Sequence, residues 1–327
     1  MTYPKIELHV HLEGTVRPAA LLQIARRNDV ALPADSVQEL ASLYEFRDFV
    51  HFLKVWALTT AALRTEQDFR QIVVDYAAQA AAFGAVYLEG ICSPAEPARR
   101  GVAWEEIFAG YCDGVAEARE LHGVRVGLTL DIPRDYPMEA AELTVTHGLA
   151  NAHRGVVGIG LGGSETHPPD PFEPVFARAK DGGLGSVPHA GESEGPESVW
   201  GAIDALGADR IRHGIRSIED PGLVRELVAR GIVLDVCPSS NVRTGVVRSL
   251  ADHPLPALLA TGVQATINTD DPAMFGIDLG GEHEIARDLG SSPRASYEAG
   301  VAGALCDDAT RSELRSIGDS FDWDAVS

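Results

Sequence analysis

Cysteines and basic residues are scarce in this sequence. Its 327 residues include only four cysteines, and 27 Lys and Arg stand against 48 Asp and Glu, for a formal net charge of −21. An excess of acidic residues repels phosphate backbones and anionic lipid head groups, so we expect neither nucleic acid nor a membrane as a partner. The scattered cysteines support neither a zinc ribbon nor a disulfide framework and predict reduced, mostly buried thiols in a cytoplasmic protein, at Cys92, Cys112, Cys237 and Cys306.

Long apolar runs are also absent. The opening segment, MTYPKIELHVHLEG, has no apolar stretch long enough for a signal peptide or a membrane span. Hydrophobic residues make up 45% of the chain and charged residues 23%, which is typical of a globular protein with a large core. The length of the chain suits either two ordinary domains or one α/β barrel with insertions.

Short β-rich segments alternate with helical segments along most of the chain. Strands that alternate with helices pair in parallel through right-handed crossovers. Eight such units favour a closed barrel over an open sheet. We therefore expect an α/β fold, a (β/α)₈ TIM barrel that forms a single domain over residues 1–327, with strands at 6–12, 85–91, 124–132, 156–162, 185–191, 210–214, 232–237 and 263–270.

The first two expected strands are unusually far apart. Residues 14–84 separate them, which is far more than one crossover helix needs. Two segments within this region, at 17–28 and 48–63, have helical patterns. We therefore expect a helical insertion after the first strand, above the mouth of the barrel, where it could form a lid.

Polar residues with metal-binding chemistry occur at several expected strand ends, where barrel enzymes carry their functional groups. His9 and His11 lie two residues apart on the first strand, so both imidazoles point the same way. His189 and His213 end the fifth and sixth strands, and Asp270 ends the eighth. Imidazoles and a carboxylate that converge at one mouth suit zinc, which takes nitrogen and oxygen ligands at ~2.0–2.2 Å.

Each of these features alone has an ordinary structural explanation. The two histidines of a His-x-His strand, or a lone histidine such as His213, commonly make structural hydrogen bonds. Asp270 and Asp271 precede Pro272 and could cap a helix or turn. Glu192 could be an acidic residue before a helix N-terminus. Four separate strand ends with this ordered set of residues favour a metal site over four coincidences.

The motifs of the chain resemble those of the adenosine deaminase family of the amidohydrolase superfamily. The similarity runs in order from residue 5 to beyond residue 275 and covers most of the chain. The most specific part is HAGE followed by RIRHG and NTDDP. The motifs that carry the resemblance are ELHVHLEGTVRP, GGSE, VPHAGESEGPESVWGAIDALGADRIRHG and TINTDDP. The resemblance implies the (β/α)₈ barrel, one zinc ion per chain, and hydrolytic removal of the 6-amino group from an adenine nucleoside.

The resemblance also implies roles for individual residues. The zinc ligands would be His9, His11, His189 and Asp270. Glu192 would protonate ring N1 while His213 orients the attacking water, and His213 or Asp270 would pass the proton of that water to the departing ammonia. The contacts with substrate would come from His11, Glu13, Arg17, from Asp271 at ring N7, and from the Gly163 backbone at N3.

The sequence departs from the family at the sugar end of the expected site. Adenosine deaminases read HLDG where this chain has Glu13, so a group other than hydroxyl could occupy carbon 5′. HLEG resembles adenine deaminases, which take the free base, whereas Arg17 matches the nucleoside enzymes. VYLEGICSP and GIVLDVCPSSNVRT resemble aminodeoxyfutalosine deaminases, whose substrate carries a benzoate-bearing arm. Arg17 or Arg243 could bind that carboxylate, although a surface ion pair is an arginine's usual role.

Other functions remain open at this point. A mononuclear amidohydrolase could act on an amide, lactone or phosphoester. The two-metal members of the superfamily usually need a carboxylated lysine on the fourth strand, and VVGIGLGG contains none. A catalytically inactive binding protein would have lost a ligand or Glu192, and all are present. Cys237-Pro238 does not supply the P-C-x-x-C element of cytidine deaminases. The oligomeric state is left open.

Overall fold

Parallel strands form the centre of the molecule. The computed structural model describes residues 2–46 and 49–326. The expected strands are all present, with bounds within three residues of those expected, as β1 (Lys5–His11), β2 (Ala85–Cys92), β3 (Arg125–Pro133), β4 (Val156–Gly162), β5 (Gly185–Ser186), β6 (His189–Ala190), β7 (Arg210–His213), β8 (Val233–Val236) and β9 (Ala265–Ile267).

The expected fifth strand appears as two short pieces, β5 and β6. The segment between them still pairs with both neighbours: the Val187 amide donates to the Ile159 carbonyl at 2.9 Å, and the Arg212 amide donates to the Pro188 carbonyl at 3.0 Å. Pro188 has no amide hydrogen to contribute to the ladder. β5 and β6 are therefore two parts of one interrupted strand.

The strands follow one another around the barrel in chain order. Each of β1 to β4 pairs in parallel with the strand that follows it, and so does each of β6 to β8. The last segment returns to the first, because the His11 amide donates to the Asp270 carbonyl at 2.8 Å and the Asp270 amide donates to the His9 carbonyl at 3.1 Å. The fold is the expected TIM barrel, and its closing contact joins two segments of the expected metal site.

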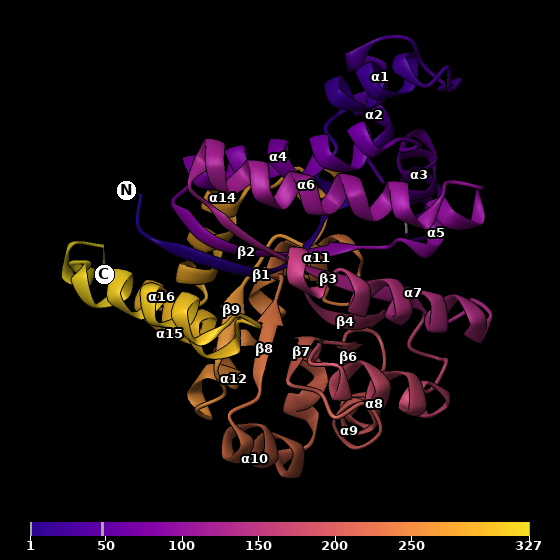
Figure 1. Cartoon of the computed structure of the whole chain (residues 1–327). Helices are drawn as coiled ribbons and strands as arrows, with labels where there is room; N and C mark the ends of the chain where they lie inside the picture. The colour runs from indigo at the N-terminus through magenta and orange to yellow at the C-terminus, as the bar shows by residue number, and fades with distance from the viewer. Residues whose placement is uncertain (1, 47–48, 327) are drawn as a thin grey trace.

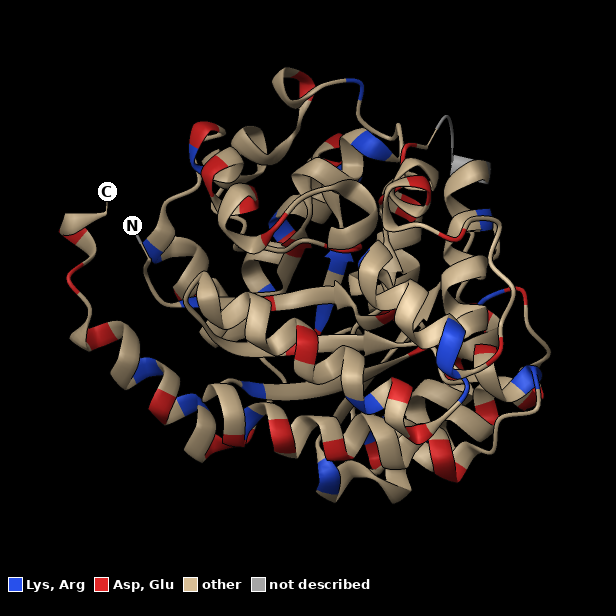
Figure 2. Cartoon of the chain, turned by 90° about the horizontal axis from the view of Figure 1, so that it is seen from above, with Lys and Arg blue, Asp and Glu red and all other residues tan. Residues whose placement is uncertain are grey.

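Helices surround the strands, as Figure 1 shows, and both acidic and basic residues lie along these outer helices (Figure 2). The longer helices outside the insertion are α4 (Glu66–Ala82), α6 (Trp104–His122), α7 (Met138–Ala150), α8 (Glu173–Asp181), α9 (Pro196–Asp204), α10 (Pro221–Arg230), α14 (Leu279–Asp288), α15 (Pro293–Gly303) and α16 (Asp308–Ser320). The shorter ones are α5 (Ala95–Arg99), α11 (Pro238–Arg243), α12 (Leu255–Ala260) and α13 (Pro272–Phe275), of which α5, α11 and α13 directly follow strands. Over the described residues, no helix combines the length and the apolar character that crossing a membrane requires.

Polar side chains define where several helices begin. The Asp220 carboxylate accepts a hydrogen bond from the Gly222 amide at 2.7 Å, and Pro221 follows it as the first residue of α10. Thr65 and Asp68 form a capping box at the start of α4. Such caps satisfy amides that the first helical turn leaves without partners. The 3₁₀ turns are η1 (Leu12–Thr15), η2 (Ala152–Arg154), η3 (Asp170–Phe172), η4 (Ile215–Glu219), η5 (Leu250–Asp252) and η6 (Trp323–Ala325).

A helical insertion follows β1, as expected. It consists of η1, α1 (Pro18–Arg27), α2 (Val37–Leu43) and α3 (Phe49–Ala62), whereas α4 is the crossover helix back to β2. Asp48, which begins the second expected helical segment, lies outside the described residues. Phe52 of α3 stacks on Phe275 of α13 with ring centroids 5.3 Å apart, and Met274 belongs to the same buried cluster. The insertion therefore packs against the helix that follows the Asp270-Asp271 pair.

The barrel interior contains charged residues as well as apolar ones. The fully buried Arg210 guanidinium lies 2.6 Å from both the Glu89 and the Asp235 carboxylates. Arg212 pairs with Asp131 in the next layer. A Cβ on Gly160 would come within 2.3 Å of both Arg212 and Asp131, so only glycine leaves room for this pair. These ion pairs fill the space below the expected metal site.

Candidate active site

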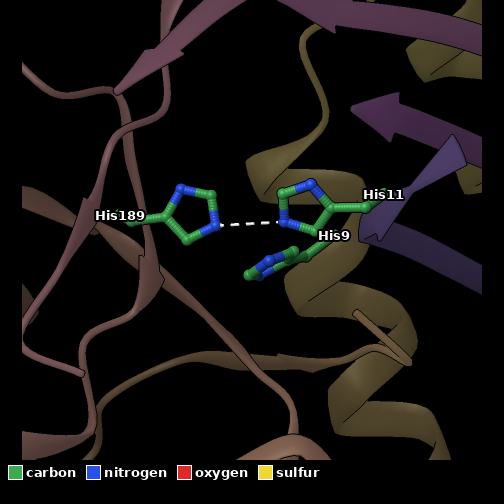
Figure 3. A group of neighbouring side chains, drawn as sticks. All are labelled: His9, His11 and His189. Atoms are coloured by element: carbon green, nitrogen blue, oxygen red, sulfur yellow. Dashed lines mark hydrogen bonds between the residues drawn. The ribbon is translucent and has the colours of Figure 1, made fainter. Parts of the chain in front are cut away.

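Three histidines and one aspartate meet at the barrel mouth. His9 and His11 project from β1 and His189 from β6, and their ring nitrogens approach one another (Figure 3). His11 Nε2 lies 3.3 Å from His189 Nε2. The Asp270 carboxylate, beyond β9, lies with its Oδ1 3.5 Å from His9 Nε2 and 3.4 Å from His11 Nε2. The structure brings the four expected ligands together.

The spacing of these atoms fits a single tetrahedral metal ion. Donor atoms that surround such an ion at 2.0–2.2 Å lie roughly 3.3–3.6 Å from one another. The buried Nε2 of His9 also has no hydrogen-bond partner among the described residues. Burial lowers the pKa of His9 to about 3 and that of His189 well below its ordinary value, so both rings are neutral and can offer a lone pair. The residues present therefore fit a metal.

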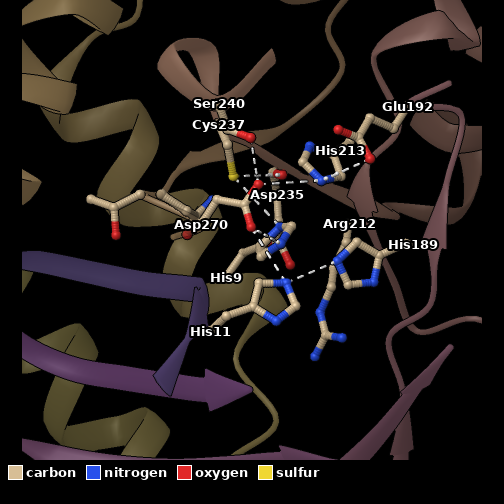
Figure 4. Close-up of polar contacts among 12 residues, drawn as sticks. His9, His11, His189, Glu192, Arg212, His213, Asp235, Cys237, Ser240 and Asp270 are labelled. Carbon is tan, nitrogen blue, oxygen red and sulfur yellow. Dashed lines mark hydrogen bonds and ion pairs between the residues drawn. The ribbon is translucent and has the colours of Figure 1, made fainter. Parts of the chain in front are cut away.

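Neighbouring side chains contact three of the four expected ligands (Figure 4). Cys237 Sγ lies 3.5 Å from His9 Nδ1, and the Ser240 hydroxyl donates to Asp270 Oδ2 at 2.5 Å. On the opposite side, His189 Nδ1 lies 3.5 Å from the Asp131 carboxylate. Partners of this kind set the ring orientation of metal-binding histidines. Sequence reasoning missed Asp131, Cys237 and Ser240 as contributors to the site, because their residue types and spacing carry no local signature.

Two residues of the site have strained backbones. His213 and Asp270 have φ angles of 60° and 62°, in the left-handed region that side chains other than glycine rarely adopt. His213 is the last residue of β7, and Asp270 follows the end of β9 by three residues. Such strain persists where the surrounding structure enforces it, and it is concentrated at functional sites. At Asp270 the two hydrogen bonds to β1 supply that enforcement.

Glu192 and His213 lie beside the histidine cluster. His213 Nε2 is 3.6 Å from Glu192 Oε2 and 3.8 Å from Asp270 Oδ2, so the ring stands between the two carboxyl groups (Figure 4). Burial raises the pKa of Glu192 from 4.5 to about 7, and the nearby Asp270 charge adds to the rise. Glu192 precedes the Gly195 cap of α9 by three residues, so it is not part of the first helical turn. A carboxyl group with this pKa can act as an acid near neutral pH.

Glu165 holds the loop that carries Glu192. Its carboxylate accepts hydrogen bonds from the backbone amides of Gly191, Glu192 and Ser193 at 2.7, 2.9 and 2.9 Å. The Ser198 hydroxyl donates to it as well, at 2.5 Å. Glu165 belongs to the GGSE motif, which resembled the family without indicating what this glutamate does. The role of this glutamate in the motif, which is to hold the Glu192 loop, is evident only from its contacts.

Two buried carboxyl groups lie at the other end of the site. Glu13 Oε1 accepts hydrogen bonds from the Ser93 amide and the Tyr111 hydroxyl, both at 2.8 Å. Its Oε2 and the Oδ1 of Asp271 are buried without a hydrogen-bond partner in the described part of the chain. Asp271 precedes α13 but makes no side-chain capping hydrogen bond, which rules out the helix-cap explanation for this residue. Both oxygens are available to a ligand.

The two glycines of this region have steric reasons for being there. A Cβ on Gly14 would come within 1.8 Å of Asp271 Oδ1, so glycine is needed next to Glu13. Gly163 follows β4 with a φ of 88°, a conformation that favours glycine and leaves its backbone uncovered by a side chain.

The two arginines considered for a substrate carboxylate are both exposed. Arg17 immediately precedes α1 and lines a small hollow with Tyr76, Phe83 and Ile277, whose lining includes no residue of the histidine cluster. Arg243 is the last residue of α11, the short helix that follows β8, and has no ion-pair partner among the described residues. The structure does not bring Arg17 into contact with the expected ligands.

The fold and the geometry of the site define the class of protein. A TIM barrel with neutral histidines and an aspartate at its mouth, and an acid beside them, is a metal-dependent hydrolase of the amidohydrolase type. The adenosine deaminase family model matches residues 4–317. The chain therefore belongs to the adenosine deaminase family and is a hydrolytic deaminase of purine amino groups.

Three relatives refine this assignment. An aminodeoxyfutalosine deaminase from Acidothermus cellulolyticus is 52% identical over 98% of this chain and 92% of its own length. The structure of an adenine deaminase from Arthrobacter aurescens superimposes with a TM-score of 0.91 and 36% identity, covering 97% of this chain and 98% of the other. A zinc-bound amidohydrolase from Burkholderia ambifaria superimposes with a TM-score of 0.90 and 26% identity, covering 99% and 91%. The relatives thus differ in their named substrates.

Proposed function

We propose that this chain uses one zinc ion to remove the 6-amino group from an adenine nucleoside extended at carbon 5′, of the aminodeoxyfutalosine type. The observation that carries the proposal is the convergence of His9, His11, His189 and Asp270 beside Glu192, whose pKa is about 7. Zinc is supported by the donor set and by the zinc-bound relative. When bound there, zinc lowers the pKa of a coordinated water toward ~7.

The residues of the chain supply the rest of the chemistry. Glu192 retains its proton at about neutral pH and donates it to ring N1, which withdraws electron density from C6. Water adds to C6 and one of its protons goes to the amino nitrogen, so the bond from C6 to that nitrogen breaks and ammonia leaves. The second water proton returns to Glu192 as C6 becomes a carbonyl carbon. His213, between Glu192 and Asp270, orients the water. Asp271 would meet ring N7, and the Gly163 backbone would meet N3.

The 5′ extension is supported by the identity to the Acidothermus enzyme and by the residues at the sugar end. Glu13 occupies the position of the family's aspartate, and its Oε1 is already engaged by Ser93 and Tyr111. Only Oε2 is left for a ligand. The exposed Arg243, without an ion-pair partner among the described residues, is the better placed cation for a carboxylate on the extension, since it follows a strand end of the barrel.

Free adenine is the second candidate substrate. The structure of the Arthrobacter adenine deaminase covers almost the whole chain, and HLEG occurs in that branch of the family. Arg17 favours the nucleoside, since adenine deaminases tend to carry an acid at its position. An adenine site would need no cavity beyond the ring, so activity towards 5′-extended nucleosides separates the two candidates.

The deciding experiment compares ammonia release from adenine, adenosine, 5′-methylthioadenosine and aminodeoxyfutalosine, with zinc content measured on the same preparation. We expect the highest kcat/KM with aminodeoxyfutalosine and one zinc per chain. A clear preference for adenine would overturn the proposed substrate while leaving the deaminase assignment intact. His189→Ala should lose the metal, whereas His153→Ala, which changes an exposed histidine at η2, should keep it. Stoichiometric zinc in His189→Ala would refute the ligand set.

Some expectations from the sequence are not tested by the structure. A single domain over residues 1–327, a cytoplasmic location, the absence of nucleic-acid partners and the motion of the insertion as a lid stay predictions. The four cysteines are all free in the structure, and all but the half-buried Cys306 are buried, as expected.

A further inference from the structure

A chain of three buried side chains runs from His213 away from the barrel mouth. His213 Nδ1 lies 3.1 Å from the Asn241 side-chain nitrogen, and the Asn241 side-chain oxygen lies 3.1 Å from His253 Nε2. His253 Nδ1 accepts a hydrogen bond from the Leu255 backbone amide at 3.1 Å. The three side chains are at most 4% exposed, so water does not interrupt the chain.

The Leu255 amide determines where the protons in this chain lie. A backbone N–H can only donate, so His253 Nδ1 must be an acceptor without a proton. Burial lowers the pKa of His253 to about 4, which keeps the ring neutral, and its one proton is therefore on Nε2. That proton is donated to the Asn241 oxygen, and the Asn241 amide group then donates to His213 Nδ1. A neutral His213 consequently carries its own proton on Nε2.

The opposite orientation of the Asn241 amide is incompatible with the single ring proton of a neutral His253. Turning the amide would place its NH₂ group against His253 Nε2, which would then have to accept. His253 would accept at both nitrogens and carry no proton at all, which a neutral imidazole cannot do. The hydrogen bonds therefore determine that the Asn241 nitrogen faces His213 and its oxygen faces His253, although the two amide atoms are alike in size.

We propose that Asn241 and His253 are positioning residues that hold His213 with its ring proton on Nε2. This inference rests on the proposed function only for the role of His213. The Nε2–H group faces Glu192 Oε2 and Asp270 Oδ2, at 3.6 and 3.8 Å. His213 therefore offers a hydrogen bond to the oxygen of the attacking water and does not take its proton. Asp270 is then the group that accepts that proton and passes it to the departing ammonia.

The direct test is the ¹⁵N NMR spectrum of the metal-loaded enzyme labelled at histidine. The His213 signals are assigned from their loss in His213→Gln. A protonated and an unprotonated ring nitrogen differ strongly in ¹⁵N shift, so the spectrum reports the tautomer without any substrate. We expect the proton of His213 on Nε2. A proton on Nδ1 in the wild-type enzyme would overturn the inference, whatever the enzyme deaminates.

Asn241→Asp replaces the hydrogen-bond donor that faces His213 with an acceptor while keeping the size of the side chain. A carboxylate accepts from both of its neighbours, so the variant should move the His213 proton to Nδ1. We expect kcat to fall about 10-fold or more with a smaller change in KM, because a positioned proton donor is lost. Asn151→Asp, at the half-buried C-terminus of α7, adds the same charge away from the site and should change neither property. An Asn241→Asp variant with an unchanged His213 spectrum and full metal content would contradict the proposal.

Discussion

Glu165 lies directly behind Glu192 and accepts the backbone amide hydrogen of Glu192 at 2.9 Å. The two glutamates stand 27 residues apart in the chain and have different tasks. The Glu165 carboxylate accepts hydrogen bonds from backbone amides and a hydroxyl, whereas the Glu192 side chain faces the barrel mouth. The Glu165 charge also contributes to the raised pKa of Glu192, after burial and the Asp270 charge. Loop position and acidity of Glu192 thus both depend on Glu165.

Glu165→Gln should slow the reaction without releasing the metal. The amide NH₂ of glutamine would face donors, at Gly191 and Ser198 or at Glu192 and Ser193. An unsatisfied buried donor costs about 1–3 kcal/mol, which corresponds to roughly 5- to 150-fold in kcat if the cost appears in the transition state. Steady-state kinetics and metal analysis measure the effect. Glu173→Gln, an exposed glutamate at the start of α8, is the control, and equal kcat in the two variants would refute the role of Glu165.

Glu192→Gln should abolish most turnover with bound metal retained. Glutamine has the same shape but no acidic proton, so the loss should reach about 10²–10⁴-fold in kcat. In the wild-type enzyme the acid form is the active one, so kcat should fall as the pH rises through about 7, the pKa of Glu192. Glu194→Gln, on the same loop, should keep both kcat and its pH profile. Full activity of Glu192→Gln would remove this residue from the mechanism.

Glu13→Asp should change which substrate is preferred. The shorter side chain cannot both keep its contacts with Ser93 and Tyr111 and reach as far into the sugar end. We expect the kcat/KM ratio of adenosine to a 5′-extended nucleoside to rise by about 10-fold, the effect of one methylene in a pocket. Tyr111→Phe removes one contact of Glu13 without moving its backbone and should change the ratio less. An unaltered ratio in Glu13→Asp would show that this position does not read carbon 5′.

Glu282→Gln should reduce the pH dependence of stability. Burial raises the pKa of Glu282 from 4.5 to about 7, so the folded protein holds a proton that the unfolded chain has lost between these values. The stabilisation is complete below about pH 4.5 and is lost as the pH rises to about 7, at most about 3 kcal/mol. The variant should therefore gain stability relative to wild type between pH 5 and 8. Urea midpoints at four pH values test this, with the exposed Glu284→Gln as the control that should show no such gain.

The secondary structure was predictable because strands and crossover helices repeat along the chain. Strand bounds were less predictable where pairing ends early: the expected strand at 263–270 pairs with β8 only over Ala265–Ile267. The segment beyond it leaves β8 and joins β1 through Asp270. The interruption between β5 and β6 likewise depends on Pro188 and on its neighbours in the barrel.

The proposed ligand set could be predicted from the sequence because its histidines and aspartate lie on or just after strands, with His9 and His11 sharing β1, and parallel strands of a barrel end at one rim. The residues that contact the proposed ligands or position His213 could not be found in this way. Asp131, Ser240, Asn241 and His253 are ordinary polar residues, and they act through partners up to 58 positions away, as Asp131 does on His189.

The sequence by itself determined that eight βα units would place three histidines and an aspartate around one centre, since alternation and strand ends are local properties. Only the tertiary structure decided the protonation of the site. The raised pKa of Glu192 and the tautomer of His213 arise from burial and from hydrogen bonds between distant segments, and neither exists until the barrel has closed.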